Sequence, residues 1–249
     1  MTRRQWAGYA FGAALASTTL DDGVAAATMR TQPVRLGVLT DASVPTHEAE
    51  RAGLEFGMAE ASHLATLLGS RLVAARGDVE DDLDSAPPVL VVPAPAAVAV
   101  ARRHPQSVVV TTRRQAIPAD LACYSVASSE RALARAERHT TPNARLADWH
   151  PGLRRYGAAQ LNERFRRAAQ RDMDEHAWHG WFACKVAVEL VIRRADEPGV
   201  PLADVPFDGH KGRALTFSAD DHHLVQPVYL VADGEEGLPR EILPEDGGR

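Results

Sequence analysis

The sequence has few of the features that mark catalytic or metal-binding proteins. It holds only two cysteines and no Cys-x-x-Cys pair, and it contains no His-Glu-x-x-His, no Gly-x-Ser-x-Gly elbow and no Gly-rich phosphate loop ending in Lys-Ser/Thr. These absences argue against a zinc protease, a nucleophile-elbow hydrolase and a P-loop nucleotidase. We therefore predict that the protein is not an enzyme, has no catalytic residues and carries no cofactor.

A strong charge of one sign is also absent. The formal net charge is -5, so a general nucleic-acid binder is not expected. Cys123 falls in a predicted strand and Cys184 on the apolar face of a predicted helix. We interpret both as small buried residues, although their spacing alone leaves a disulfide open. The chain is long and apolar enough to fold, because 249 residues with 45% hydrophobic content suffice for a sizeable core in one or two domains.

Residues 1–27 have the composition of an export signal. Arg3 and Arg4 precede a short apolar run at 7–16, and alanines at 25–27 offer small residues for cleavage. The apolar run is too short to span a bilayer, so we predict a periplasmic mature chain without a membrane span. The arginine pair resembles a twin-arginine signal. A general secretory signal and an uncleaved anchor remain alternatives.

From Val34 onward the pattern alternates between short apolar segments and amphipathic ones. Apolar strands separated by helices indicate a mostly parallel sheet with helices on both faces, which is an α/β fold. The predicted strands lie at 34–40, 71–75, 89–92, 107–112 and 122–126, and the predicted helices at 47–68, 97–103 and 128–138.

Residues 149–194 hold three of the four tryptophans and the clearest helical period. Apolar residues recur at i, i+4, i+7, i+11 and i+14 from Ala177 to Val191, with a second stripe beside them. Two adjoining stripes predict a largely buried helix with Trp181 in the core. Asp172 and Glu175 suit an N-terminal capping box for this helix, and a shorter, half-buried helix precedes it. Farther along, 214–218 and 225–231 around a polar turn predict a β-hairpin.

Several stretches resemble the type I periplasmic binding proteins of ABC importers, the leucine/isoleucine/valine-receptor class. The opening stretch is Val34-Arg-Leu-Gly-Val-Leu-Thr40, followed by a loop and a long helix. More specific stretches resemble the branch associated with quinone-dependent alcohol dehydrogenases: Trp149-His150-Pro151, Tyr156 to Phe165, Ala177-Trp178-His179-Gly180-Trp181 and Phe207-Asp208-Gly209-His210-Lys211-Gly212. The resemblance implies an exported solute-binding-like component of an ABC importer, with a small-molecule ligand and an ABC permease as partners.

The resemblance also implies that one lobe is missing. In that class a second α/β lobe lies between the helix starting here at Ser128 and the segment starting at Trp149, where this chain has room only for a loop. We expect a single lobe plus the C-terminal hairpin, with a homodimer mate or partner protein replacing the other lobe. The alternative is a non-enzymatic accessory or scaffold protein of a periplasmic quinone-dependent alcohol oxidation system. The predicted domains are an export signal at 1–27, a binding-protein-like domain at 28–234 and a flexible tail at 235–249.

Parallel sheets bind ligands at the carboxyl ends of their strands. Polar side chains follow the first and fourth predicted strands, so we predict that they converge on a ligand, with Arg113 pairing with a carboxylate. Ordinary polar loop residues are the competing interpretation. The predicted ligand-binding residues are Asp41, Ser43, Thr46, Thr112 and Arg113.

Two other groups carry weaker signals for metal binding. Asp172, His176 and His179 share one helix face, and acidic residues crowd 78–84. A helix cap with packed imidazoles and a solvated loop explain these patterns more simply, and we predict no metal site. The arginines between 154 and 171 could face an anionic partner, although a solvated helix face is the simpler interpretation.

Overall fold

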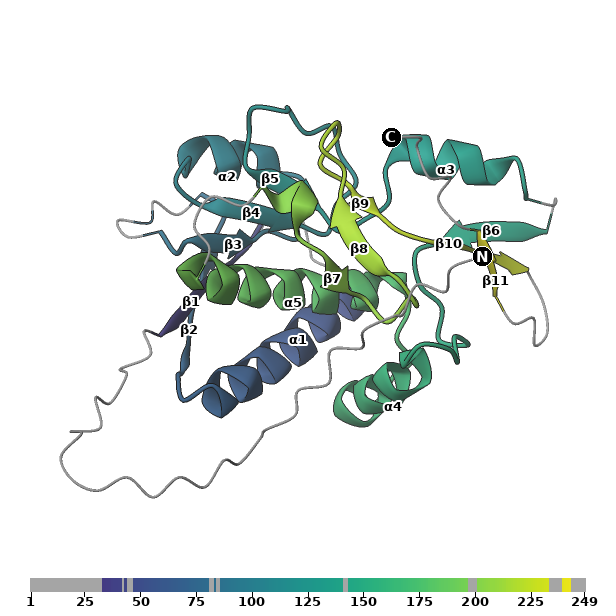
Figure 1. Cartoon of the computed structure of the whole chain (residues 1–249), viewed down its shortest axis with the longest axis horizontal. Helices are drawn as coiled ribbons and strands as arrows, with labels where there is room; N and C mark the ends of the chain where they lie inside the picture. Colours follow the sequence, from purple (N-terminus) through teal and green to yellow (C-terminus); the bar gives the residue numbers. More distant parts are fainter. Residues whose placement is uncertain are drawn as a thin grey trace, which may run out of the picture. The chain divides into compact units, whose positions relative to one another are not determined.

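Five short, mainly apolar strands form a parallel sheet in the computed structural model, which describes residues 33–41, 43, 47–80, 83, 86–140, 143–196, 201–232 and 239–242. The sheet has the order β2-β1-β3-β4-β5, with every neighbouring pair parallel (Figure 1). Its strands are β1 (Val34–Thr40), β2 (Leu72–Asp78), β3 (Val89–Val91), β4 (Val108–Thr111) and β5 (Cys123–Ser125). The predicted parallel sheet is confirmed, and β2 runs farther than 71–75.

Helices cover both faces of this sheet, as the apolar strands predict. Helices α1 (Glu48–Leu67) and α5 (Glu175–Asp196) lie on one face and α2 (Ala97–Arg103) on the other (Figure 1). Side chains of a strand alternate between faces. Val89 and Val91 of β3 accordingly join the apolar cluster of α1 and α5, whereas Leu90 joins the cluster of α2.

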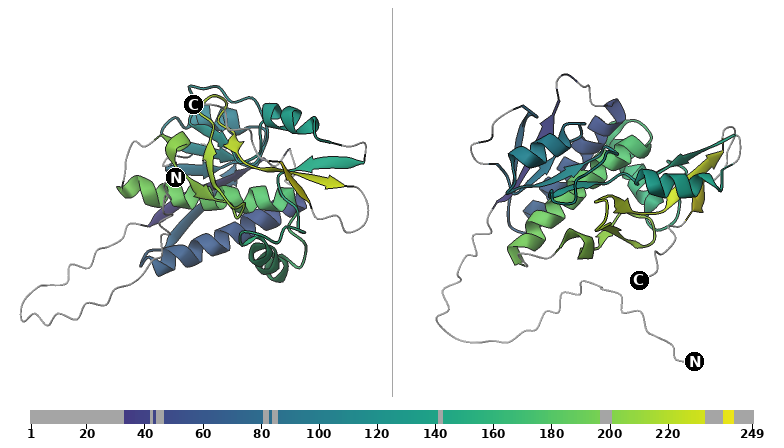
Figure 2. Two further views of the ribbon diagram at one scale, coloured as in Figure 1. Left: turned by 45° about the vertical axis from the view of Figure 1, so that its right-hand side comes forward. Right: turned by 90° about the horizontal axis from the view of Figure 1, so that it is seen from above.

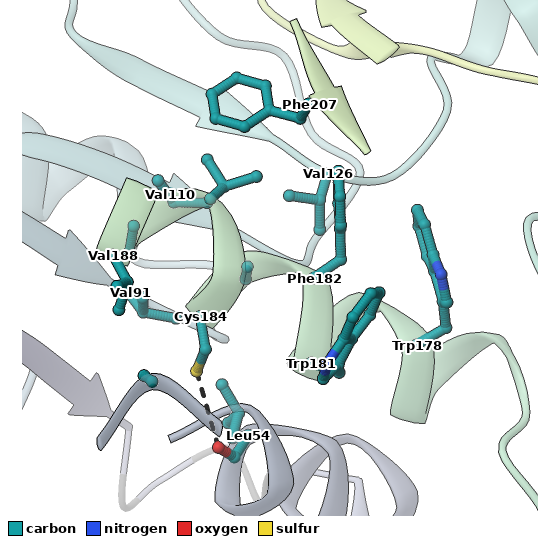
Figure 3. Close-up of a cluster of buried hydrophobic side chains, with 14 of the residues drawn as sticks. Leu54, Val91, Val110, Val126, Trp178, Trp181, Phe182, Cys184, Val188 and Phe207 are labelled. Carbon is teal, nitrogen blue, oxygen red and sulfur yellow. Dashed lines mark hydrogen bonds between the residues drawn. The ribbon is translucent and has the colours of Figure 1, made fainter. Parts of the chain in front are cut away.

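Small residues bring α1 and α5 into close contact. A Cβ atom placed on Gly53 would lie 2.0 Å from the Ala177 carbonyl oxygen, and one on Gly180 would lie 2.4 Å from that of Glu50. The Cys184 thiol donates to the Leu54 carbonyl oxygen at 3.6 Å, beside the tryptophan cluster (Figure 3). The two helices therefore pack backbone against backbone, and Trp181 is buried at 2% exposure, which confirms its predicted place in the core.

Both cysteines are buried and free. Burial raises the pKa of the Cys123 and Cys184 thiols to about 12 each, so both stay protonated at neutral pH. The interpretation of these residues as small buried apolar groups is confirmed.

The remaining described elements form two smaller antiparallel sheets and two further α-helices. One sheet has the order β11-β10-β6 and the other β7-β8-β9, and Figure 2 shows β6, β10 and β11 beside the parallel sheet. The elements are α3 (Glu130–Glu137), β6 (Ala144–Ala147), α4 (Ala158–Ala169), a 3-10 turn at Leu202–Asp204, β7 (Phe207–Asp208), β8 (Ala214–Phe217), β9 (Leu224–Val225), β10 (Val228–Ala232) and β11 (Arg240–Ile242).

The C-terminal hairpin differs from its prediction. The predicted strand 225–231 is divided: β9 pairs with β8, whereas β10 pairs with β6 and β11. The division falls at Gln226 and Pro227. Proline has no N–H for a ladder, and the buried Gln226 side chain donates from Nε2 to the Val126 carbonyl oxygen at 3.0 Å. Strand β6 lies where only a loop was expected, and β11 lies inside the segment assigned to a flexible tail.

The predicted helix caps are shifted by one or two residues. Asp174, not Asp172, caps α5, because its Oδ1 accepts from the Ala177 N–H at 2.9 Å. Ser129, not Ser128, caps α3, through a hydrogen bond from the Ala132 N–H at 3.2 Å. In both cases the neighbouring polar residue expected to cap the helix has another partner.

Residues 1–32 and Thr46 lie outside the described residues, and so does the predicted export signal. Among the helices that are described, none combines the length and apolar character needed to cross a membrane.

Candidate ligand-binding edge of the parallel sheet

The predicted ligand-binding residues follow two strands of the parallel sheet. Asp41 and Ser43 come after β1, and Thr112 and Arg113 come after β4, with β3 between these strands. Asp41 Oδ1 accepts from the Ser43 N–H at 2.8 Å and from its hydroxyl at 2.5 Å. The carboxyl ends of parallel strands share one edge, so these residues lie along the expected edge.

Thr112 and Arg113 meet at a residue that sequence reasoning missed. Glu50, in the first turn of α1, is 2% exposed and accepts from Arg113 Nη2 at 2.9 Å. The Thr112 hydroxyl donates to the other carboxylate oxygen. A signal was available, because Glu50 lies in register with the buried residues Gly53, Leu54 and Gly57, and a carboxylate on an apolar stripe needs a partner.

At the sheet edge, Arg113 therefore belongs to a pre-positioned and overall neutral ion pair with Glu50 and is not a free cation. The Arg113 side chain is 30% exposed and its Nε also donates to the Pro93 carbonyl oxygen at 3.4 Å. Within the described residues its Nη1 has no hydrogen-bond partner. The guanidinium is thus oriented by two contacts while one nitrogen stays available to a carboxylate or another acceptor.

A second polar cluster lies next to the sheet of β6, β10 and β11. Asp148, just after β6, accepts from the Ser128 N–H at 3.0 Å and from its hydroxyl at 2.6 Å, and the His179 Nε2 atom lies 2.9 Å from its Oδ2. Burial raises the pKa of Asp148, but the hydrogen bond and charge of His179, together with Lys211 and Ser128, outweigh it and bring the pKa well below the ordinary range.

Lys211 completes this cluster. Its buried Nζ donates to the Asp148 carbonyl oxygen, to Gln226 Oε1 at 2.6 Å and to the Pro227 carbonyl oxygen at 3.4 Å. Burial lowers its pKa to about 7, against the opposing charges of Asp148, Glu175 and Glu241. The Asp148 carboxylate sits between Ser128 and His179, and within the described residues no hydrogen bond joins these two. The cluster therefore holds separate segments of the chain together. It is not a Ser-His-Asp triad, in which the histidine would contact the serine.

The weaker metal candidates do not come together. Asp172 pairs with Arg166 at 2.8 Å, His176 stacks on His47 with 4.5 Å between ring centroids, and His179 binds Asp148. No group of three histidine, cysteine or acidic side chains in the described part of the chain is placed to hold a metal ion. Asp81, Asp82 and Asp84 lie outside the described residues.

The fold matches that of solved transport proteins. An ABC transporter substrate-binding protein from Sphaerobacter thermophilus superposes with a TM-score of 0.63 at 11% identity, over 85% of this chain and 96% of that one. A solute-binding protein of an R. palustris ABC transporter, in complex with benzoate, gives 0.56 at 12% identity, over 86% and 98%. A substrate-binding protein from Desulfitobacterium hafniense gives 0.51 at 10% identity, over 85% and 100%.

By sequence, no protein-family model and no curated protein matches the chain. At identities this low the likeness concerns the fold. The five-stranded parallel sheet with helices on both faces corresponds to one lobe of that fold. The chain therefore has the type I periplasmic-binding-protein fold found in ABC transporter substrate-binding proteins.

Proposed function

We propose that the protein is an exported solute-binding-like component of an ABC importer and that it binds a small molecule at the carboxyl edge of the parallel sheet. The observation that carries the proposal is Arg113, which is half-buried at this edge and oriented by Glu50 and Pro93. The solved proteins of the same fold bind solutes for ABC transporters, and one of them holds benzoate. An organic carboxylate is the ligand class that suits the remaining guanidinium nitrogen.

The proposal includes the partners expected of such a component. An ABC permease would receive the ligand, and a second copy of this chain or another protein would cover the sheet edge in place of a second lobe. Charged residues, a short apolar run and small residues within 1–27 support export to the periplasm.

Calorimetric titration with a panel of small organic carboxylates tests the binding proposal. Replacing Arg113 alone would leave the buried Glu50 carboxylate without its partner, so the test variant is the double replacement Arg113→Met with Glu50→Gln. Arg167→Ala on α4 is the control, because Arg167 is an exposed arginine paired only locally with Glu163. We expect the double variant to lose the one molecule of carboxylate bound at the sheet edge and the control to keep it. A panel without any ligand would instead favour the accessory or scaffold function.

Amino-terminal sequencing of material from the periplasmic fraction tests export. We expect the mature chain to begin near Thr28, after the alanines at 25–27. Recovery of a chain beginning at Met1, or its absence from that fraction, would contradict this part of the proposal.

A further inference from the structure

A cavity of about 240 Å³ shares no lining residue with the sheet edge. Four parts of the chain form it: the loop before α4, the loop between β7 and β8, strand β10 and strand β11. Its main polar and aromatic residues are Arg154, Arg155, Tyr156, His210, Tyr229 and Glu241. Two stretches that the sequence singled out, 156–165 and 207–212, meet here, and the sheet-edge site uses neither.

Tyr229 indicates that this cavity is built for a polar ligand. The side chain lines the cavity and is only 4% exposed, yet its hydroxyl has no hydrogen-bond partner within the described residues. Burial, together with Glu241 and Tyr156, raises the pKa of the phenol above its ordinary value. The hydroxyl is therefore protonated at neutral pH and can donate. The hydroxyl is not one of the fully buried unpartnered atoms of the described residues, so it opens on the cavity, where an acceptor on a ligand can replace water as its partner.

The charges around the cavity favour a monoanion. Arg154 and Arg155 are exposed at its rim and make no ion pair with other described residues. Glu241 supplies one negative charge in the lining against these two positive charges. Behind the lining, the buried Asp148 carboxylate also acts on Tyr229, and Lys211, 5.3 Å from the Tyr229 ring centre, opposes it. Leu153, Ala158 and Pro239 line the rest of the wall, so the body of the ligand meets an apolar surface.

The two loops hold each other in place. Tyr156 and His210 both have left-handed backbones, with φ of 57° and 58°. Each side chain lies against a glycine of the other loop: a Cβ atom on Gly212 would lie 2.4 Å from the Tyr156 ring, and one on Gly157 would lie 2.8 Å from His210 Nδ1. The cavity wall is thus fixed before any ligand binds, which lowers the entropic cost of binding.

We propose that this cavity is a second binding site, which takes a small monocarboxylate with an apolar body. Its carboxylate accepts a hydrogen bond from Tyr229 and pairs with Arg154 and Arg155, while the apolar body contacts Leu153 and Pro239. The site is independent of the sheet edge and of its proposed ligand.

Titration calorimetry on the full chain tests this proposal with benzoate and hexanoate, and with benzamide and hexanamide as uncharged counterparts. We expect saturable binding of the carboxylates and not of the amides. Tyr229→Phe removes only the hydroxyl and should weaken binding about tenfold, the effect of one charge-assisted hydrogen bond. Arg154→Ala with Arg155→Ala should weaken it further, and Arg167→Ala should leave it unchanged.

The variant Arg113→Met with Glu50→Gln separates this site from the sheet edge. We expect this variant to keep carboxylate binding at the cavity, whether or not the sheet edge also binds a ligand. The cavity proposal is overturned if no carboxylate binds saturably, if the amides bind equally well, or if Tyr229→Phe leaves the affinity unchanged. Loss of all binding in the Arg113 variant alone would assign the ligand to the sheet edge instead. Thermal unfolding of each variant verifies that it is folded.

Discussion

The ammonium nitrogen of Lys211 lies 4.1 Å from the centre of the Trp178 ring. A cation over the face of an indole is attracted by the ring, and more strongly when water is excluded. Trp178 is fully buried on α5, and its Nε1 donates to the Gly209 carbonyl oxygen at 3.3 Å. The loop carrying Lys211 is therefore attached to α5 at two points.

Replacing Lys211 should destabilise the fold strongly. Lys211→Met keeps most of the side-chain volume but leaves three buried oxygen acceptors without their donor, at an expected cost of about 3 to 5 kcal/mol. Urea denaturation measures this. Lys185→Met is the control, because Lys185 makes a partly exposed pair with Glu189 on α5, which is worth about 1 kcal/mol or less.

Comparison of the wild type with Lys211→Met also tests the lowered pKa of Lys211. The folded state releases this proton near pH 7, whereas the unfolded state holds it up to the ordinary value of 10.5. Between these values the unfolded state binds more protons, so the contribution of Lys211 to stability rises with pH. The difference in unfolding free energy between wild type and Lys211→Met should grow from about pH 7 to pH 9. A constant difference would contradict the lowered pKa.

Asp148 should make stability sensitive to acid. Its folded-state pKa is lowered, so its contribution is fully present above the ordinary carboxyl range and is lost as pH falls below it. Asp148→Asn should cost about 2 to 4 kcal/mol at neutral pH, through lost charge-assisted hydrogen bonds. Denaturation curves at decreasing pH should show the wild type approaching the variant. Parallel curves would indicate that the carboxylate titrates normally.

Trp181 should contribute to stability as a core residue. It is almost fully buried and its Nε1 donates to Glu60 Oε2 at 2.8 Å. Trp181→Ala should cost about 3 to 5 kcal/mol, the range for a buried large aromatic side chain. Trp181→Phe fills more of the space and should cost less. An unchanged urea midpoint for the alanine variant would place the side chain outside the core.

Gly53→Ala should destabilise the protein although alanine favours helix formation by about 1 kcal/mol over glycine. The added methyl group would meet the Ala177 carbonyl oxygen at 2.0 Å, and backbone cannot move aside as a side chain can. Overpacking of this kind costs about 1 to 3 kcal/mol. A thermal melt shifted upward would show that α1 and α5 can separate without penalty.

Periodicity predicted the elements whose contacts are mainly apolar. The five strands and the helix around Trp181 follow from alternation and from the period of about 3.6, because burial of those side chains decides their structure. Periodicity alone did not predict the split at Gln226, although Pro227 was a signal for it, because proline cannot donate to a strand ladder. The buried partner of Gln226, Lys211, lies in another segment of the chain and could not be predicted from the local pattern.

For the candidate site, the sequence indicated which strand ends carry polar groups and not what those groups contact. Thr112 and Arg113 were identified. Their partner Glu50 lies on α1, 63 residues before Arg113. Similarly, Lys211 in a glycine-containing loop suggests an exposed side chain, whereas it is buried. The helical period can mark Glu50 as buried, but no periodic pattern shows which distant residue will be its partner.

The contact between Leu54 and Cys184 joins residues 130 positions apart in sequence. Because α5 shares the cover of one face of the parallel sheet with α1, the cover of that face stays incomplete in a growing chain until the residues of α5 have been synthesised. Chain closure over so long a separation slows folding, and apolar strands stay open to aggregation meanwhile. We therefore expect slow refolding in dilute solution and a yield that falls as protein concentration rises.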